Sequence, residues 1–129
     1  MTAIKATLQG YRQAPRKVRL MADLIRGKTV TDATTALKFA PKRAADVIEK
    51  LLASAVANAK NLNIESAGLI VKEITVNGGT IMYRRRPMSR GRPFPIRKRT
   101  SHISITLDES VNAKKLPKIK KEKTTKSTK

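Results

Sequence analysis

The chain has 129 residues, enough for one modest domain, and its 40% hydrophobic content can supply a single core. A formal net charge of +20 and a pI near 11.1 point to a polyanionic partner, nucleic acid first and an acidic membrane second. The absence of cysteine excludes disulfides and thiolate metal sites. No apolar run is long enough for a signal or membrane helix, so we expect a soluble, cytoplasmic protein.

The first two elements expected are a strand and an amphipathic helix. Apolar and polar residues alternate over residues 4–8, which is typical of a strand. Residues 15–26 begin with proline, are followed by glycine, and have apolar residues at the i, i+3, i+4, i+7 spacing of a helix. These apolar residues are Val18, Met21, Ala22 and Ile25.

Two further helices are predicted before the chain changes pattern. A short one runs from Thr31 or Asp32 to Phe39, and a long one runs from Lys42 to about Asn61. The long helix has an apolar stripe with a period near 3.6 residues, so we expect it to be the core helix. The stripe consists of Ala44, Ile48, Leu51, Leu52, Ala55, Val56 and Ala59.

Strand patterns return at residues 69–76 and 103–107, which are rich in β-branched residues. We therefore predict an α+β fold, with three helices packed on a small antiparallel three-stranded sheet. The motif Asn77-Gly78-Gly79 alone would predict a hairpin turn. That turn would leave the 103–107 strand without an obvious partner, so we prefer a bulge at these glycines and a turn around Ser89-Arg90-Gly91.

Residues 84–99 hold eight arginines or lysines and no carboxylate. With a turn near their midpoint they form the far end of a long β-hairpin over about residues 77–102, which must project beyond a small body. We expect residues 1–110 to form one domain that includes this hairpin. Residues 111–129 form a lysine-rich tail with too few large apolar residues to fold, which we predict to be disordered.

The types of basic residue differ between the two charged segments. Seven of the eight cations in residues 84–99 are arginines, which bind phosphate bidentately and stack on exposed bases, whereas every cation of the tail is lysine. The alternative to nucleic-acid binding is a solvated basic loop.

Arg16, Lys17 and Arg19 lie near a predicted helix N-terminus, where a phosphate would neutralise them. A solvated helix face is the alternative there.

No catalytic or metal-binding pattern is found. His102 is the only histidine, so a structural hydrogen bond or an RNA contact is expected rather than a metal site. The carboxylates are dispersed, no nucleophile–base pattern or P-loop is present, and we expect neither an enzyme nor a cofactor. We expect Tyr83 to pack at the base of the hairpin, while Phe94 near the tip could stack on a base.

Three segments resemble one known family. They are APRKVRLMADLIRGK at 14–28, LLASAVANAKN at 51–61, and RGR followed by IRKRTSHISI within 90–105. Together, over about residues 3–108, they resemble the bacterial-type large-subunit ribosomal protein L22 family. The resemblance implies a protein of the large ribosomal subunit that binds 23S-type rRNA, supports subunit assembly and lines the nascent-peptide exit tunnel with its hairpin. It also implies contacts with neighbouring ribosomal proteins and with the nascent polypeptide, no membrane, and a monomer within the ribosome.

Charge and resemblance together predict the site residues. Those expected at rRNA are Arg12, Arg16, Lys17, Arg19, Arg84, Arg85, Arg86, Arg90, Arg92, Arg97, Lys98, Arg99, Thr100, Ser101 and His102. Those expected at the tunnel-lining tip are Met88, Ser89, Arg90, Gly91, Arg92 and Pro93. The chain departs from the family pattern at Ala14, where a serine is common, and at Met88 and Phe94-Pro95, so the tip's shape is not carried over.

Two other classes of function fit parts of the pattern. An architectural DNA-binding protein would use a basic β-arm with proline near its tip in the minor groove, but it needs a dimer for which no surplus apolar surface is evident. A polybasic membrane-surface protein would use the lysine tail but would leave the arginine-rich hairpin unexplained.

Overall fold

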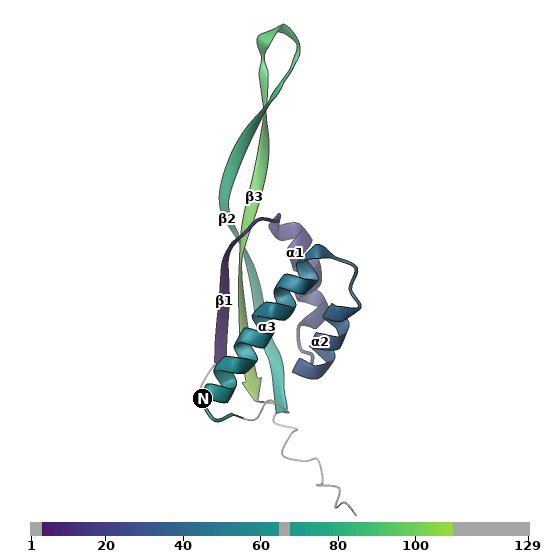
Figure 1. Ribbon diagram of the computed structural model, residues 1–129, viewed down its shortest axis with the longest axis vertical. Helices are drawn as coiled ribbons and strands as arrows, with labels where there is room; N and C mark the ends of the chain where they lie inside the picture. Colours follow the sequence, from purple (N-terminus) through teal and green to yellow (C-terminus); the bar gives the residue numbers. More distant parts are fainter. Residues whose placement is uncertain (1–3, 65–67, 110–129) are drawn as a thin grey trace, which may run out of the picture.

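The computed structural model describes residues 4–64 and 68–109 of the chain. In chain order these residues form β1 (Ile4–Tyr11), α1 (Pro15–Ile25), α2 (Val30–Lys38), α3 (Arg43–Asn61), β2 (Leu69–Pro87) and β3 (Pro93–Glu109) (Figure 1). The strands make one antiparallel sheet in the order β1-β3-β2. The predicted α+β fold is therefore confirmed for the described residues. The predicted tail, residues 111–129, lies outside them.

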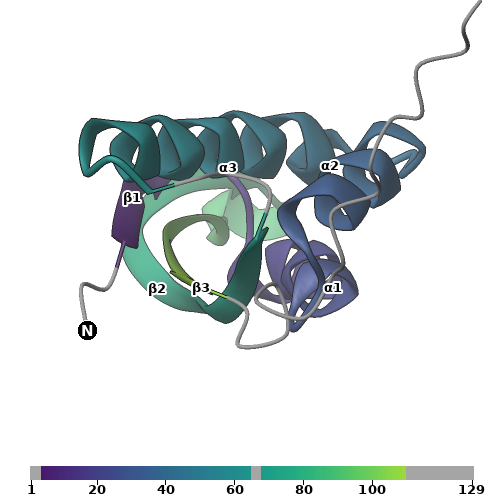
Figure 2. The ribbon, with the colours of Figure 1, turned by 90° about the horizontal axis from the view of Figure 1, so that it is seen from below.

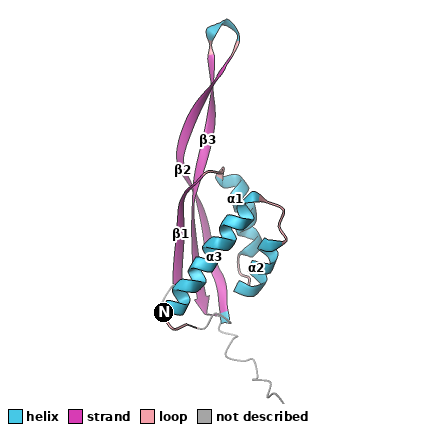
Figure 3. Ribbon diagram, in the orientation of Figure 1, coloured by secondary structure: helices cyan, strands magenta, loops and turns pink. Residues whose placement is uncertain are grey.

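The helices gather at one end of a long two-stranded ribbon. Seen from below in Figure 2, α3 runs across one side of the sheet, while α1 and α2 lie next to the β2 edge. Figure 3 shows that the helices cover only the lower part of β2 and β3, and that these strands continue far above the body as a twisted hairpin. We call the hairpin beyond the bulge at Gly78–Ile81 the arm, and the remainder of the described chain the body.

The core forms where one face of the sheet meets the apolar faces of the helices. The four predicted apolar residues of α1 are buried, and so is the predicted stripe of α3, except that Val56 is only half-buried and Ala45 joins the core. The sheet contributes alternate residues from each strand. These are Ile4 and Ala6 from β1, Leu69, Val71, Ile74 and Val76 from β2, and Ile103, Ile105 and Leu107 from β3.

The helix ends follow local chemistry. Helix α1 begins at Pro15 after Ala14, which supplies no side-chain cap, and Gly27 follows the helix with a φ of 73° that glycine tolerates. Helix α2 begins at Val30 rather than at the predicted Thr31 or Asp32. The difference arises because the Thr29 hydroxyl accepts a hydrogen bond from the Asp32 amide at 3.2 Å and so acts as the N-cap.

Two irregularities in the β2–β3 pairing set the direction of the arm. The first lies between Val71 and Glu73 and moves the buried positions of β2 from odd to even residue numbers. The second lies between Gly78 and Ile81. Beyond it the pairing continues without interruption to a short 3₁₀ turn at Ser89–Gly91. The predicted bulge at the glycines and the predicted turn are both confirmed.

Close packing at Gly79 marks the point where the arm leaves the body. A Cβ atom at Gly79 would lie 2.6 Å from Thr100 Oγ1 and 2.8 Å from His102 Nε2. Both neighbours are held in place, because the Thr100 hydroxyl donates to the Thr80 carbonyl at 2.7 Å and His102 Nδ1 accepts from the Gly10 amide at 3.2 Å. Of the two alternatives predicted for His102, a structural hydrogen bond or an RNA contact, the structure shows the hydrogen bond.

We expect Gly79→Ala to destabilise the protein by about 1–3 kcal/mol, because the new methyl group must displace two hydrogen-bonded side chains. Gly78→Ala is the matched control, since a Cβ there meets only Pro15 Cγ at 4.0 Å. The control should change stability by no more than about 0.5 kcal/mol. Denaturant melts of the two full-length variants measure both, and equal effects would show that the contacts of Gly79 do not constrain the arm.

Candidate nucleic-acid interface

The register of the arm places a cation directly opposite an apolar residue in six consecutive pairs. One group of three cations, Arg84–Arg86, is the outer trio, and the other, residues 97–99, is the inner trio. The outer trio faces Ile96, Pro95 and Phe94, and the inner trio faces Tyr83, Met82 and Ile81. The two trios are therefore staggered along the arm rather than side by side.

This stagger relieves repulsion within the arm. Directly opposed side chains of a β-ribbon have Cβ atoms only about 5 Å apart, so like charges there are destabilising. A two-residue slip would keep every side chain on its face but would oppose cations. In one direction it would pair Arg84 with Lys98 and Arg85 with Arg97, and in the other it would pair Arg86 with Arg92. The observed register avoids all three oppositions.

The arm is open on both faces. Every residue from 83 to 99 is exposed. Successive side chains of a strand point to opposite faces, so each basic trio presents charge on both sides of the ribbon. The prediction that Tyr83 packs at the base of the arm is wrong. Its side chain is 57% exposed, because the body ends at the bulge and Tyr83 lies beyond it.

A basic groove of about 430 Å³ lies where the arm meets the body. It brings together the residues before α1, the start of α3 and the inner trio. Its lining comprises Arg12, Gln13, Ala14, Lys17, Arg43, Met82, Arg97, Lys98 and Arg99. No carboxylate is among these residues, so the groove is an electropositive cleft.

A second basic hollow adjoins the first. It has a volume of about 450 Å³ and is lined by Ala14, Pro15, Arg16, Lys17, Arg19 and Arg99. Lys17 and Arg99 line both, so the two form one continuous basic surface. It includes the N-terminus of α1, whose partial positive charge favours an anion. Guanidinium groups arranged in this way can bind several phosphates of one nucleic-acid backbone.

Arg43 was not among the predicted site residues. It lies at the N-terminal end of α3, and its carbonyl accepts a hydrogen bond from the Tyr11 hydroxyl at 3.4 Å, which links the start of α3 to the end of β1. A basic residue at the start of a predicted helix was the signal used for Arg16 and Lys17. The same signal could have identified Arg43.

The ion pairs between described residues use cations outside the arm and the groove. Arg26 pairs with Asp23 at 2.9 Å and Lys72 pairs with Asp108 at 2.7 Å. The hydrogen bond and charge of Asp108 raise the pKa of Lys72 above its usual value. The arm and groove cations therefore have no such carboxylate partner within residues 4–64 and 68–109, and their charge is available to a ligand.

Three predicted rRNA-binding residues lie at the root of the arm rather than on its surface. Thr100 and Ser101 are only 6% and 0% exposed, and His102 is half-buried with its Nδ1 bonded to Gly10. The Thr100 hydroxyl is engaged by the Thr80 carbonyl. We therefore leave the two buried hydroxyl residues out of the proposed interface.

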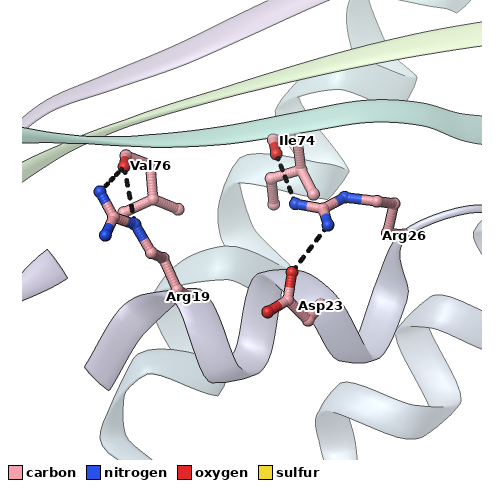
Figure 4. Close-up of polar contacts among 5 residues, drawn as sticks. All are labelled: Arg19, Asp23, Arg26, Ile74 and Val76. Carbon is pink, nitrogen blue, oxygen red and sulfur yellow. Dashed lines mark hydrogen bonds and ion pairs between the residues drawn. The ribbon is translucent and has the colours of Figure 1, made fainter. Parts of the chain in front are cut away.

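Arg19 and Arg26 bind α1 to the free edge of the sheet, as Figure 4 shows. The Nε and Nη2 groups of Arg19 both donate to the Val76 carbonyl, at 3.2 and 3.0 Å, and Arg26 Nη2 donates to the Ile74 carbonyl at 3.3 Å. Just after the helix, the Gly27 amide donates to the Val71 carbonyl at 2.9 Å. Together these bonds cover the edge of β2 that faces away from β3 and hold the strand that leads into the arm.

Replacing Arg19 should therefore affect folding. We expect Arg19→Ala to cost about 1–2 kcal/mol, because two charge-assisted hydrogen bonds to a sheet carbonyl are lost. The control is Arg16→Ala on the same helix, whose side chain makes no bond to another described residue. It should change stability by no more than about 0.5 kcal/mol. Thermal or denaturant melts measure the difference, and equal stability of the two variants would contradict the edge-binding role.

Among residues 4–64 and 68–109 no group of three or more His, Cys, Asp or Glu side chains could hold a metal ion. None of the helices in this part of the chain is long and apolar enough to cross a membrane.

A basic groove beside the N-terminus of α1 and a projecting arm with cations on both faces define a nucleic-acid-binding protein of the α+β class. A family model described as Ribosomal protein L22p/L17e matches residues 6–108, and the chain belongs to this family. The family is one of structural, not enzymatic, ribosomal proteins. This protein is accordingly a component of the large ribosomal subunit in the cytoplasm, where it binds rRNA and serves translation.

Proposed function

We propose that the arm passes between segments of 23S-type rRNA and that its tip forms part of the wall of the nascent-peptide exit tunnel. The groove at the base of the arm holds the rRNA backbone that enters beside it. The tip comprises Met88, Ser89, Arg90, Gly91, Arg92 and Pro93. The protein would in this way support subunit assembly, because it joins RNA segments that lie on different sides of the arm.

The observation that carries this proposal is the presence of charge on both faces of the arm. A ribbon lying on an RNA surface needs cations on one face only. Here each trio alternates between faces, and no part of the body covers residues 83–99. Neutralising all these cations requires phosphates on both sides of the arm, as expected for a segment surrounded by RNA.

The shape of the tip supports access to a narrow space. Arg90 and Gly91 have φ angles of 59° and 68°, and the Met88 amide donates to the Arg92 carbonyl at 3.0 Å. The two strands are therefore joined by a tight turn. Met88 is 55% exposed beside Arg90 and Arg92, so the tip offers both an apolar and a cationic surface to a passing polypeptide.

The remaining parts of the proposal concern organisation and partners. Residues 1–110 act as one domain, with residues 111–129 as diffuse counter-charge for rRNA. The protein acts as a monomer within the subunit and contacts neighbouring large-subunit proteins through the body. The nascent polypeptide is a partner of the tip alone.

The groove predicts a specific salt dependence of rRNA binding. Arg97→Gln and Arg99→Gln should each make the log–log dependence of affinity on salt shallower by about 0.7–0.9, because each removes one phosphate contact. The matched control is Lys50→Gln, an exposed lysine of α3 that does not line the groove. Filter binding of large-subunit rRNA to the full-length proteins measures these slopes. Unchanged slopes for both arginine variants would place the groove away from RNA phosphate.

The tunnel contact can be tested separately, because the chain has no natural cysteine. Ser89→Cys places one thiol at the tip, and Lys60→Cys places one on the exposed face of α3. In ribosomes that contain these variants and hold a stalled nascent chain, a short thiol-reactive cross-linker should join the nascent chain to the tip cysteine only. Absence of this cross-link at every nascent-chain length would refute the tunnel proposal. It would leave the proposal of rRNA binding untouched.

A further inference from the structure

Two aromatic side chains of the arm are exposed, and no element of the described chain covers them. Tyr83 is 57% exposed and Phe94 is 60% exposed. Each lies directly opposite an arginine in the β2–β3 pairing, Tyr83 opposite Arg97 and Phe94 opposite Arg86. Opposed residues share a face of the ribbon and have close Cβ atoms, so each ring has an arginine at the neighbouring cross-strand position on its own face.

The two pairs lie on opposite faces of the arm. Along β2 they occupy Tyr83 and Arg86, which are three residues apart, and the pairing between these positions has no bulge. Since side chains alternate along a strand, an odd separation puts the two pairs on opposite sides. The arm therefore carries one aromatic–arginine pair on each face.

The surroundings of the rings favour RNA over protein as their partner. The ionisable neighbours of both rings on the arm are cations, and residues 84–99 contain no carboxylate. An unpaired nucleotide supplies both complements at once, a flat base for the ring and a phosphate for the guanidinium. A protein partner would have to supply an apolar pocket and a carboxylate at each of two sites on opposite faces.

We propose that Tyr83 with Arg97, and Phe94 with Arg86, form two nucleotide-binding sites. In each site an unpaired base stacks on the ring, and the opposite guanidinium binds the adjoining phosphate. The inference rests on the proposed RNA contact of the arm and extends it from phosphate neutralisation to base contact. Because Arg97 also lines the basic groove, the Tyr83 site continues the path of the RNA backbone from the groove onto the arm.

Tyrosine fluorescence tests the first site directly, because the chain has no tryptophan and only two tyrosines. In full-length protein carrying Tyr11→Phe, the emission reports Tyr83 alone. The probes are oligoadenylate and inorganic polyphosphate, a polyanion without bases. Both should bind, but only oligoadenylate should quench the emission. The second site is read in the same way with Phe94→Tyr in a Tyr11→Phe, Tyr83→Phe background.

The outcomes separate this inference from the function on which it rests. Binding of both probes with no quenching by oligoadenylate, or with equal quenching by polyphosphate, overturns the stacking sites and leaves phosphate binding intact. Failure of both probes to bind rejects the RNA contact of the arm and the stacking sites together.

Affinity gives a second readout. Tyr83→Leu and Phe94→Leu should each weaken oligoadenylate binding about tenfold, since base stacking is lost. The log–log salt slope should stay unchanged, because the rings carry no charge. Ile96→Leu, at an exposed apolar position between the two sites, is the matched control and should leave affinity unchanged. If the two ring variants lost as much affinity for polyphosphate, the rings would only maintain the shape of the arm, and the inference would fail.

Discussion

Repulsion between cations in a two-stranded ribbon is the constraint on which this structure depends. Within the described residues no helix or third strand supports the arm, and a ribbon of this kind is marginally stable in water. With Arg84–Arg86 on one strand and residues 97–99 on the other, a register that opposed the two trios would add repulsion to that weakness. The observed register instead sets each trio against three apolar residues, so these six cross-strand pairs oppose no two cations.

The register of the arm is fixed at its root in the body. The bulge at Gly78–Ile81 determines which residue of β2 first meets β3 beyond the core, and Gly79 is held against Thr100 and His102. On the outer side, Arg19 holds β2 through the Val76 carbonyl, just before the bulge. The packing of α1 against β2 thus helps to fix the register in which the distant cations of the arm are paired. The body in this way supports the exposed arm.

Sequence reasoning predicted what depends on local pattern. The helices, the bulge and the tip turn follow from periodicity, from glycine and proline positions, and from the need of the 103–107 strand for a partner. It did not predict that Arg19 would bind a sheet carbonyl, because that depends on how α1 lies along β2. It misplaced Tyr83 because the two glycines predict the bulge but do not show that the body ends there. It missed Arg43, although the signal used for Arg16 and Lys17, a basic residue at the start of a predicted helix, applied there as well. Only the fold shows that Arg43 and Arg97 line one groove.

Folding and RNA recognition place compatible demands on the arm. To fold without RNA, each cation needs a neighbour that does not repel it, and an apolar side chain meets this need. To bind RNA, a cation gains from an adjacent flat apolar surface, because nucleotides carry bases as well as phosphates. Where the apolar neighbour is aromatic, as at Tyr83 and Phe94, one cross-strand pair can meet both needs. A hairpin with the same charge but only small polar neighbours would have the same phosphate affinity and no surface for a base. The apolar residues of the arm therefore provide a basis for distinguishing an RNA chain from a simple polyanion.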